Sequence, residues 1–531
     1  MGISDIELLF VSSGCDEEMV TVEDTRSQPG PHDRSINGHD LSPNSLTNGL
    51  TATTVLAESP DREATRYLSA ATQVDIGYAS FVVEKVIYEP FRALAPTFGV
   101  NVPVVAKWAI KALHTRARRD AVLSMMLLVF VLVSVLTFQW LLMLILLPIL
   151  LLAAWLTVSW EHWKRHNTVT GKMLRDRFNP GEAPEPRQEA HRQRLQEVEK
   201  RRDGNLVVFS GHSAFIGSGK RLYFQKILLD VSRGTENKDG SRKKPKPFDS
   251  QDLHTALVEA FDIENGLGKK LNNLKVYERL FVNGLNIQDS ELFKRADSLH
   301  SPPTSVDKKF LAEAAKHPTP EARTYVCVDM TGWKGQLVVT LFVRAVHTGD
   351  SLYIEWTFRV LPPLKKPFLL IDDLYELSRR RQVGMSLRFG LQDTVPALLS
   401  SPLSAVSSYR RPYTAIRREL RQADRIKRGF VFDYGAQRSI REQACGRQRQ
   451  HYFLARDEHM YVLLAQQKLT QAVGDFLSEH DVALVEFESQ TKNIFNQTLN
   501  VTNVGDIKDS TGVVIGDKSK ANVRNSAKEN R

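Results

Sequence analysis

Residues 121–160 read AVLSMMLLVFVLVSVLTFQWLLMLILLPILLLAAWLTVSW, and this stretch decides the fold because it contains no charged side chain. One helix crosses the roughly 30 Å hydrocarbon core of a bilayer with about 20 residues, so a stretch of this length fits two crossings. Its middle carries Gln139, the only amide, beside Trp140, a residue type that settles at membrane boundaries. We therefore predict a transmembrane helical hairpin that runs out from Ala121 to Leu136 and back from Leu141 to Trp160.

Basic residues flank the apolar stretch on both sides. They are Lys107, Lys111, Arg116, Arg118 and Arg119 before it and Lys164, Arg165, Lys172, Arg175 and Arg177 after it. Because Lys and Arg beside membrane helices stay in the cytoplasm, we expect both termini there, in a multi-pass protein of the cell (plasma) membrane. The expected partners are the lipid bilayer and, at the basic flanks, anionic lipid headgroups. The alternative is a buried hairpin inside a large soluble protein, which the uninterrupted apolar run disfavours.

Composition fits a folded protein of a reducing compartment. The chain has 531 residues, 42% of them hydrophobic, and a net charge of +10. Much of the basic excess lies beside the apolar stretch or in 379–428, so an anionic lipid surface explains it at least as simply as nucleic acid does. Cys15, Cys327 and Cys445 are too widely spaced for a disulfide framework or a metal knuckle. The N-terminus lacks the pattern of a cleaved signal, so we expect the hairpin itself to direct insertion.

Composition and hydrophobic period divide the rest of the chain. Residues 1–60 are rich in Ser, Thr, Asn, Gly and Pro, and we predict a disordered tail there. Apolar residues at helical spacing predict a cytoplasmic helical segment over 61–116. Residues 180–203 are predicted to be a linker and a charged stalk, and we interpret the helical stalk at 188–202 as a solvated spacer. The remaining predicted segments are a cytoplasmic α+β domain over 204–455, a long helix over 456–489 and a β-prone interaction tail over 490–531.

The α+β domain is predicted to be built on an antiparallel sheet with added helices. The segments 325–330, 337–346 and 352–360 are joined by short connections that contain glycine, which predicts an antiparallel meander. In the last segment apolar residues alternate with polar ones, as is typical of a strand with one buried face. Two further strands are predicted at 206–210 and 222–231, with a glycine-rich turn between them.

The glycine-rich stretch 211–220 superficially suggests a phosphate-binding loop. A Walker loop needs a glycine five residues before the final Gly-Lys pair and Ser or Thr after the lysine. Ala214 and Arg221 stand at those places, and the stretch is followed by a strand instead of a helix. We therefore favour a glycine-bearing hairpin or wide turn. The alternative is an anion nest of another kind, formed by Gly217, Ser218, Gly219 and Lys220.

No residue pattern identifies a reaction. His212 has no Ser or Asp partner at a defensible spacing, and no cluster of His, Cys, Asp or Glu has metal-ligand spacing. We therefore assign no catalytic, cofactor-binding or metal-binding residue, expect no cofactor and favour a protein that is not an enzyme. The basic run 410–428 lacks the aromatic interleaving of nucleic-acid modules, so a solvated helix face explains it best and a membrane-apposed face comes next.

The C-terminal tail repeats a short β-prone pattern. Val504-Gly505-Asp506 recurs eleven residues later as Ile515-Gly516-Asp517, on a background rich in Asn and β-branched residues. Two such segments can stack as rungs of a β-arch, but an isolated hairpin is marginal and needs copies of itself or a partner. The residues predicted to carry self-association are Val504, Gly505, Asp506, Val513, Ile515, Gly516 and Asp517.

The sequence resembles known families in two ways. Residues 511–517, TGVVIGD, resemble the short C-terminal motifs of amyloid-signalling proteins, related to homotypic-interaction motifs with a (V/I)-x-(V/I)-G core. The basic-flanked hairpin and three further stretches resemble a family of bacterial integral membrane proteins of unknown function, over about residues 65–400. These stretches are APTFGV at 95–100, VFSGHSAFIGSG at 208–219 and ERLFVNG at 278–284. The second resemblance implies a membrane-bound architecture and supplies no activity.

These observations predict an integral membrane protein that acts as a cytoplasm-facing scaffold or signalling protein and assembles through its C-terminal motif. The alternative is a membrane-bound enzyme or ligand-binding protein that uses the loop at 211–220 for a phosphate-bearing ligand. A third hypothesis is a membrane-perturbing effector, in which assembly of the cytoplasmic arms rearranges the hairpin. We rank it last because a hairpin that is apolar all round suits lipid better than a water-filled pore.

Overall fold

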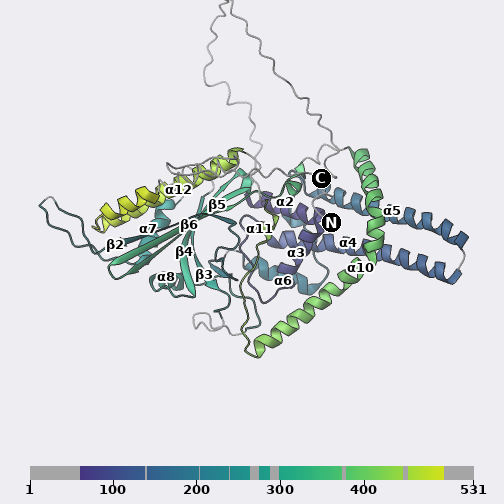
Figure 1. The fold of residues 1–531 in the computed structure, drawn as a ribbon, viewed down its shortest axis with the longest axis horizontal. Coiled ribbons are helices and arrows are strands. Elements are labelled where there is room, and N and C mark those ends of the chain that lie inside the picture. Colours follow the sequence, from purple (N-terminus) through teal and green to yellow (C-terminus); the bar gives the residue numbers. More distant parts are fainter. Residues whose placement is uncertain are drawn as a thin grey trace, which may run out of the picture. The chain divides into compact units, whose positions relative to one another are not determined.

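A helical bundle, a long apolar hairpin and a sheet covered by helices make up the chain in its computed structural model (Figure 1). The structure describes residues 60–137, 140–202, 204–237, 239–262, 274–287, 298–372, 378–446 and 452–494. The predicted self-association motifs at 504–517 and the predicted disordered tail before residue 60 lie outside the described residues, so both stay predictions.

Three short helices pack around the first half of a long one to form the helical bundle. They are α2 (Pro60–Val74), α3 (Ile76–Val86) and α6 (Glu189–Lys200), and the long helix is α4 (Val102–Thr137). Side chains from all four helices share one core, in which the indole of Trp108 is 1% exposed. The bundle therefore holds the first half of α4 as a core helix.

The helical stalk at 188–202 is not the solvated spacer that its composition predicts. Its helix α6 buries His191, Leu195 and Val198 against the bundle core. These three residues follow one another at intervals of four and three, so even a helix with few apolar residues presents a continuous apolar face. The prediction counted apolar residues and overlooked how they are spaced.

The second half of α4 and the helix α5 (Trp140–Lys172) form the apolar hairpin. Both helices are long and apolar enough to cross a membrane, and 17% of the apolar window in α4 and 22% of that in α5 is buried. Leu128, Leu136 and Leu144 are 63%, 74% and 68% exposed. Since a core helix of a soluble protein buries such side chains, the alternative of a buried soluble hairpin does not describe these helices.

The sheet has six strands in the order β1-β3-β4-β5-β6-β2. The strands are β1 (Leu206–Phe209), β2 (Lys220–Asp230), β3 (Leu274–Asn283), β4 (Ala322–Gly332), β5 (Leu337–Thr348) and β6 (Ser351–Leu361). The strands β4, β5 and β6 form the predicted antiparallel meander. However, β1 pairs parallel with β3, so the sheet is mixed and not antiparallel throughout. The long connection from β1 to β3 allows this parallel pairing.

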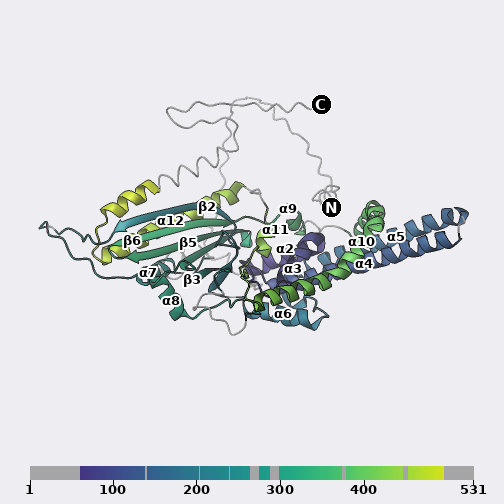
Figure 2. The ribbon, with the colours of Figure 1, turned by 60° about the horizontal axis from the view of Figure 1, so that its bottom comes forward.

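Both faces of the sheet are covered, contrary to the prediction of a half-buried strand at 352–360. One face packs on α7 (Ser250–Phe261) and α12 (Tyr452–Glu479), which Figure 2 shows beside the strands. On the opposite face of β6, Glu355 and Thr357 are 7% and 4% exposed. The polar residues that alternate along β6 therefore lie on a second buried face, where their side chains form hydrogen bonds.

The glycine-rich stretch 211–219 is part of that second cover and not a hairpin. It joins β1 to β2, which lie at opposite edges of the sheet, so the stretch must cross the sheet. Phe215 packs against Phe342 and Tyr325, with ring centroids 4.4 Å and 5.1 Å apart. Sequence proximity suggested a tight turn between two strands that the fold places far apart.

Four further helices are α8 (Lys308–Lys316), α9 (Lys366–Leu369), α10 (Arg379–Lys427) and α11 (Ile440–Ala444). The first packs on the sheet, and the other three lie against the bundle or the hairpin. The 49-residue helix α10 packs across α4 and α5, as Figure 1 shows. The predicted helix over 456–489 is interrupted, because α12 ends at Glu479 and Asp481 adopts a φ of 57°. The chain is helical again over 485–494, so the first five residues of the predicted β-prone tail are helical as well.

Candidate functional site

A buried network of charged side chains lies where the apolar part of the hairpin begins. Arg119 Nη2 donates to Asp120 Oδ1 at 2.6 Å, and Arg119 Nη1 donates to Glu161 Oε2 at 3.2 Å. Arg165 Nε lies 3.0 Å from Glu161 Oε1. The side chains of Arg119, Asp120 and Glu161 are 3%, 3% and 4% exposed. The network therefore fastens α4 to α5 at the base of the hairpin.

Opposite charges nearly balance within this network, which explains why it can be buried. Burial alone would raise the pKa of Glu161, but Arg165, Arg119 and Arg116 outweigh it and hold that pKa below its ordinary value. Burial, together with the neighbouring Arg119, lowers the pKa of Arg116. Buried charges of this kind persist only when each finds a partner, so the five side chains act as one unit.

The helix α10 joins the same site through Asp393. His162 Nε2 lies 2.9 Å from Asp393 Oδ2, and Arg165 Nη2 lies 3.1 Å from His162 Nδ1. Because a guanidinium can only donate, Nδ1 accepts, and the hydrogen-bond network assigns the proton on Nε2 to the bond with Asp393. The bond from His162 lowers the pKa of Asp393. Asp393 is therefore held as a carboxylate against α5.

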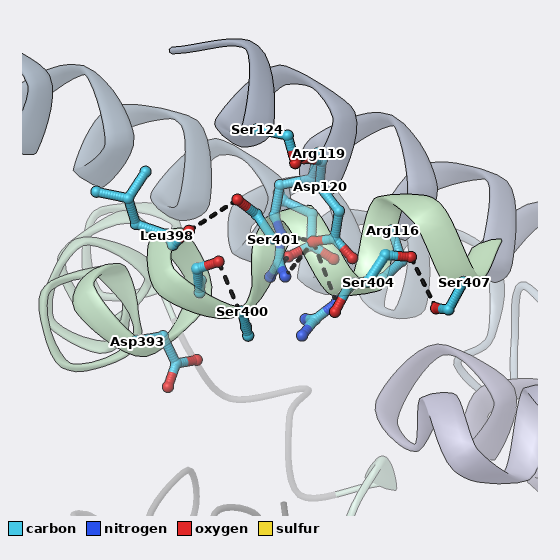
Figure 3. Close-up of polar contacts among 12 residues, drawn as sticks. Arg116, Arg119, Asp120, Ser124, Asp393, Leu398, Ser400, Ser401, Ser404 and Ser407 are labelled. Carbon is cyan, nitrogen blue, oxygen red and sulfur yellow. Dashed lines mark hydrogen bonds and ion pairs between the residues drawn. The ribbon is translucent and has the colours of Figure 1, made fainter. Parts of the chain in front are cut away.

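Close backbone approach fixes α10 beside α5. A Cβ atom at Gly390 would lie 2.0 Å from Ser159 Oγ, so this position requires glycine. The indole of Trp155 donates from Nε1 to the carbonyl oxygen of Leu387 at 2.9 Å. Figure 3 shows Arg119 and Asp120 on α4 facing the part of α10 that carries a row of serines. The base of the hairpin is thus a junction of three helices.

The backbone of the glycine-rich loop binds a carboxylate that belongs to the chain itself. The backbone N–H groups of Gly217 and Gly219 donate to Glu442 Oε1 at 3.0 Å and 2.8 Å. Both glycines have positive φ, 89° and 81°, which points their amides at one oxygen. Of the other residues predicted for the nest, Ser218 donates its amide to Phe215 O, and Lys220 opens β2 with an exposed side chain.

Glu442 lies on α11, a short helix that connects the sheet to the bundle. Burial raises the pKa of Glu442, although the two loop amides favour its ionised form. The neighbouring Arg441 donates to the carbonyl oxygens of Phe98 and Gly335. Motif reasoning missed Glu442 because more than 220 residues separate it from the loop, and no sequence signal links the two.

A cavity of about 400 Å³ lies between the bundle and the sheet. Six basic residues line it against two acidic ones, Glu278 and Asp329. The basic residues are Arg92, Arg194, Arg201, Arg202, Lys275 and Arg279. Tyr277 Oη donates to Asp329 Oδ2 at 2.6 Å and Thr340 Oγ1 donates to Asp329 Oδ1 at 2.7 Å, while burial raises the pKa of Asp329. The cavity is therefore lined mainly by basic side chains, and the carboxyl group of Asp329 in its wall is hydrogen-bonded on both oxygens.

Other predicted residues stand as follows in the described ranges. Ala121 and Leu136 lie on α4, and Leu141 and Trp160 lie on α5. Trp160 stacks on Trp163, with ring centroids 5.0 Å apart, at the boundary of the apolar stretch. No group of three or more His, Cys, Asp or Glu side chains within the described ranges is arranged to hold a metal ion.

Comparison with known proteins assigns the second half of the chain to a family. The model of the AbeC-like domain family matches residues 226–510, which is more than half of the 531 residues. The match begins within β2, includes α10 and α12, and leaves out the bundle and the hairpin, unlike the resemblance predicted over 65–400. Residues 511–517 lie outside it, so the amyloid-signalling resemblance stays a prediction. No curated protein and no solved structure matches. The chain belongs to the AbeC-like domain family.

Proposed function

We propose that the protein is an integral membrane protein that holds an α+β domain at the cytoplasmic face of the bilayer and acts there as a scaffold or signalling protein. The observation that carries this proposal is the contrast along α4. Its first half is core to the bundle, where Trp108 is 1% exposed, and its second half turns apolar side chains such as Leu136, 74% exposed, outward. A surrounding of lipid makes such exposure favourable, which supports the proposal.

The junction at the hairpin base supports a role in signalling. The helices α4 and α5 run without a break from the bundle into the apolar hairpin, and Arg119 and Glu161 fasten them together. Rigid helices carry a displacement along their length, so a change at the hairpin reaches the bundle. A scaffold that senses the state of the membrane requires this connection.

Reporter fusions test the membrane topology directly. Fusions at residues 60 and 300 of the full chain should both report the cytoplasm, because an even number of crossings separates them. The protein should also resist extraction from membranes by alkaline carbonate. Opposite reports from the two fusions would mean one crossing, and extraction by carbonate would mean that the hairpin does not insert; either result overturns the proposal.

Homotypic assembly through residues 490–531 completes the proposed function. Stacking of Val504-Gly505-Asp506 on Ile515-Gly516-Asp517 satisfies backbone groups between chains. Clustering in the membrane plane raises the local concentration and favours this pairing. The variant Ile515→Asp puts a charge into the stack and should abolish clustering while membrane insertion stays intact, whereas Ala521→Asp serves as the control outside the motif. Equal clustering of the wild type and of a chain ending at residue 489 would remove this part of the proposal.

The basic cavity favours ligand binding as a second candidate function. Its six basic side chains suit an anionic ligand with phosphate groups, and Lys275 and Arg279 come from the same strand, β3. Titration calorimetry of the full-length protein with inorganic phosphate and with ATP tests this assignment. Binding that Lys275→Ala weakens and Lys220→Ala leaves unchanged would place the ligand in the cavity. Loss of binding in Lys220→Ala would place it at the glycine-rich loop, and no binding at all would end this candidate.

A further inference from the structure

The middle of α10 contains a long stretch without basic residues. Residues 389–409, which we call the collar segment, read FGLQDTVPALLSSPLSAVSSY and contain one charged residue, Asp393. Its carboxylate is paired with His162 of α5 at 2.9 Å. Arginines bracket the segment, with Arg388 before it and Arg410 and Arg411 after it. This pattern places an apolar stretch between two cationic ends.

Contacts place the collar segment at the depth of the apolar hairpin. Ala397 and Leu398 are 3% and 5% exposed and share a core with Leu123, Leu150, Ala154 and Val158 of the hairpin. All four hairpin residues belong to the apolar stretch 121–160. Figure 1 shows α10 crossing both hairpin helices. If the hairpin lies in a bilayer, the helix that packs on these residues lies at the same depth.

The outer face of the collar segment is apolar and has no partner among the described residues. Leu391, Val395, Leu399 and Leu403 are 68%, 52%, 68% and 80% exposed. They follow one another at intervals of four residues, so they form one stripe along the helix. A stripe of exposed leucine and valine over about 18 Å, at 1.5 Å per residue, needs an apolar cover.

In the collar segment a serine hydroxyl replaces a backbone hydrogen bond that a proline removes. Pro402 has no N–H group, so it cannot bond to the carbonyl oxygen of Leu398, four residues earlier. Ser401 Oγ donates to that oxygen instead, at 2.8 Å, and Figure 3 shows this bond. Thr394 Oγ1 also donates to a carbonyl oxygen of its own helix, that of Gly390, at 2.5 Å, although no proline has freed that carbonyl. Hydroxyls that satisfy freed carbonyls are the means by which membrane helices accommodate proline.

From these observations we propose that the collar segment is a third membrane-embedded element, a helix that lies in the plane of the cytoplasmic interface. Its stripe faces the acyl chains, and Arg388, Arg410 and Arg411 bind the phosphates of anionic headgroups. The segment of about 31 Å, at 1.5 Å per residue, sets how deeply the hairpin inserts. The inference rests on the proposed membrane anchoring and adds the lipid interface as the occupant of this face.

Fluorescence quenching in reconstituted full-length protein tests the proposal. A dye is attached to a single cysteine at Leu399→Cys, at Leu420→Cys or at Leu132→Cys, with Cys15 and Cys445 replaced by serine and the buried Cys327 kept. Leu399 and Leu420 are 68% and 64% exposed, so they form a matched pair on one helix. Leu132 reports on the hairpin. The quenchers are doxyl-labelled lipid in the vesicle and iodide in the water.

Each outcome decides one claim. The proposal expects lipid quenching at residues 132 and 399 and iodide quenching at residue 420. If lipid quenches the dye at residue 132 but iodide quenches it at residue 399, the collar segment does not lie in lipid, and the membrane anchoring of the hairpin still holds. If neither agent quenches the dye at residue 399, a second copy of the chain covers the stripe, which also overturns the collar proposal and leaves the anchoring intact. Iodide quenching at 132 overturns the anchoring itself. Lipid quenching at 399 should weaken in vesicles of phosphatidylcholine relative to vesicles containing phosphatidylglycerol, and equal quenching would overturn the role of the arginines.

Discussion

At the scale of residues, the buried charges at the hairpin base depend on one arginine. Arg119 touches both Asp120 and Glu161, and all three side chains are at most 4% exposed. Replacing Arg119 by Met leaves two buried carboxylates short of a partner, so the free energy of unfolding should fall by about 3–5 kcal/mol. Thermal unfolding in detergent measures this loss.

The neighbouring Arg118 supplies the control for this experiment. Arg118 lies on the exposed side of the same helix, so Arg118→Met should change stability by about 0.5 kcal/mol or less. Similar losses in Arg118→Met and Arg119→Met would show that the ion network does not hold the junction together.

Three histidines, His114, His166 and His191, give stability a defined dependence on pH, because burial lowers the pKa of each. Burial lowers the pKa of His166 and of His191 from the ordinary value of 6.5, and for His191 the nearby His114 adds to the effect. The unfolded chain therefore takes up protons more readily, so stability is complete above pH 6.5 and is lost as pH falls below it. The melting temperature should decrease between about pH 7 and about pH 5.

Single variants identify the source of that pH dependence. His191→Phe keeps an aromatic ring beside Tyr88, whose centroid lies 6.0 Å away, and should flatten the pH profile. His317→Phe changes a side chain that is 78% exposed and should leave the profile as in the wild type. If the profile of His191→Phe matches that of the wild type, the dependence comes from other groups.

Glu442 shows how one residue closes a site that the sequence suggested for a ligand. Its carboxylate accepts from Gly217 N and Gly219 N, and Glu442→Ala leaves these two amides without their acceptor. We expect a loss of about 1–3 kcal/mol in the free energy of unfolding. Gln443→Ala, at the exposed neighbour, should have little effect on the same melting curve. Equal effects would assign the loss to α11 as a whole.

At the scale of elements, α10 combines proline with hydroxyl side chains. Ser401→Ala removes the donor to the carbonyl oxygen of Leu398 and should destabilise the protein by about 1 kcal/mol. The double variant Ser401→Ala/Pro402→Ala returns a backbone N–H to that carbonyl and should recover the loss. Melting curves of the two variants distinguish loss of the hydrogen bond from loss of packing, because a packing effect of Ser401 would persist in the double variant.

At the scale of the whole molecule, the hairpin beyond the junction is separable from the rest. Deleting residues 128–149 and closing the gap with a short Gly/Ser loop keeps Leu123, Ala154 and Val158 against α10. The shortened protein should fold and be released from membranes by alkaline carbonate, while the full chain is retained. Retention of the shortened protein would show that other elements suffice for integral anchoring.

Local sequence patterns were enough to predict the elements that depend only on neighbouring residues in the chain. A stretch of forty residues without charge predicts long apolar helices, so the composition of residues 121–160 is enough to predict the two helices of the hairpin. The strands β4, β5 and β6 follow one another with short connections, and chain connectivity alone sets their antiparallel order. Their partners are neighbours in sequence, which is why the predictions for them are confirmed.

Only the tertiary structure decided features that depend on partners far apart in the chain. The parallel pairing of β1 with β3, the occupation of the glycine-rich loop by Glu442 and the burial of the polar face of β6 each join segments with no local signal. The same holds for α10, because only the packing of Ala397 and Leu398 against Leu123 and Val158 shows that its middle lies beside the hairpin. Periodicity in a sequence reports that a face will be buried, but the fold alone selects what covers it, because burial is a property of the assembled surfaces.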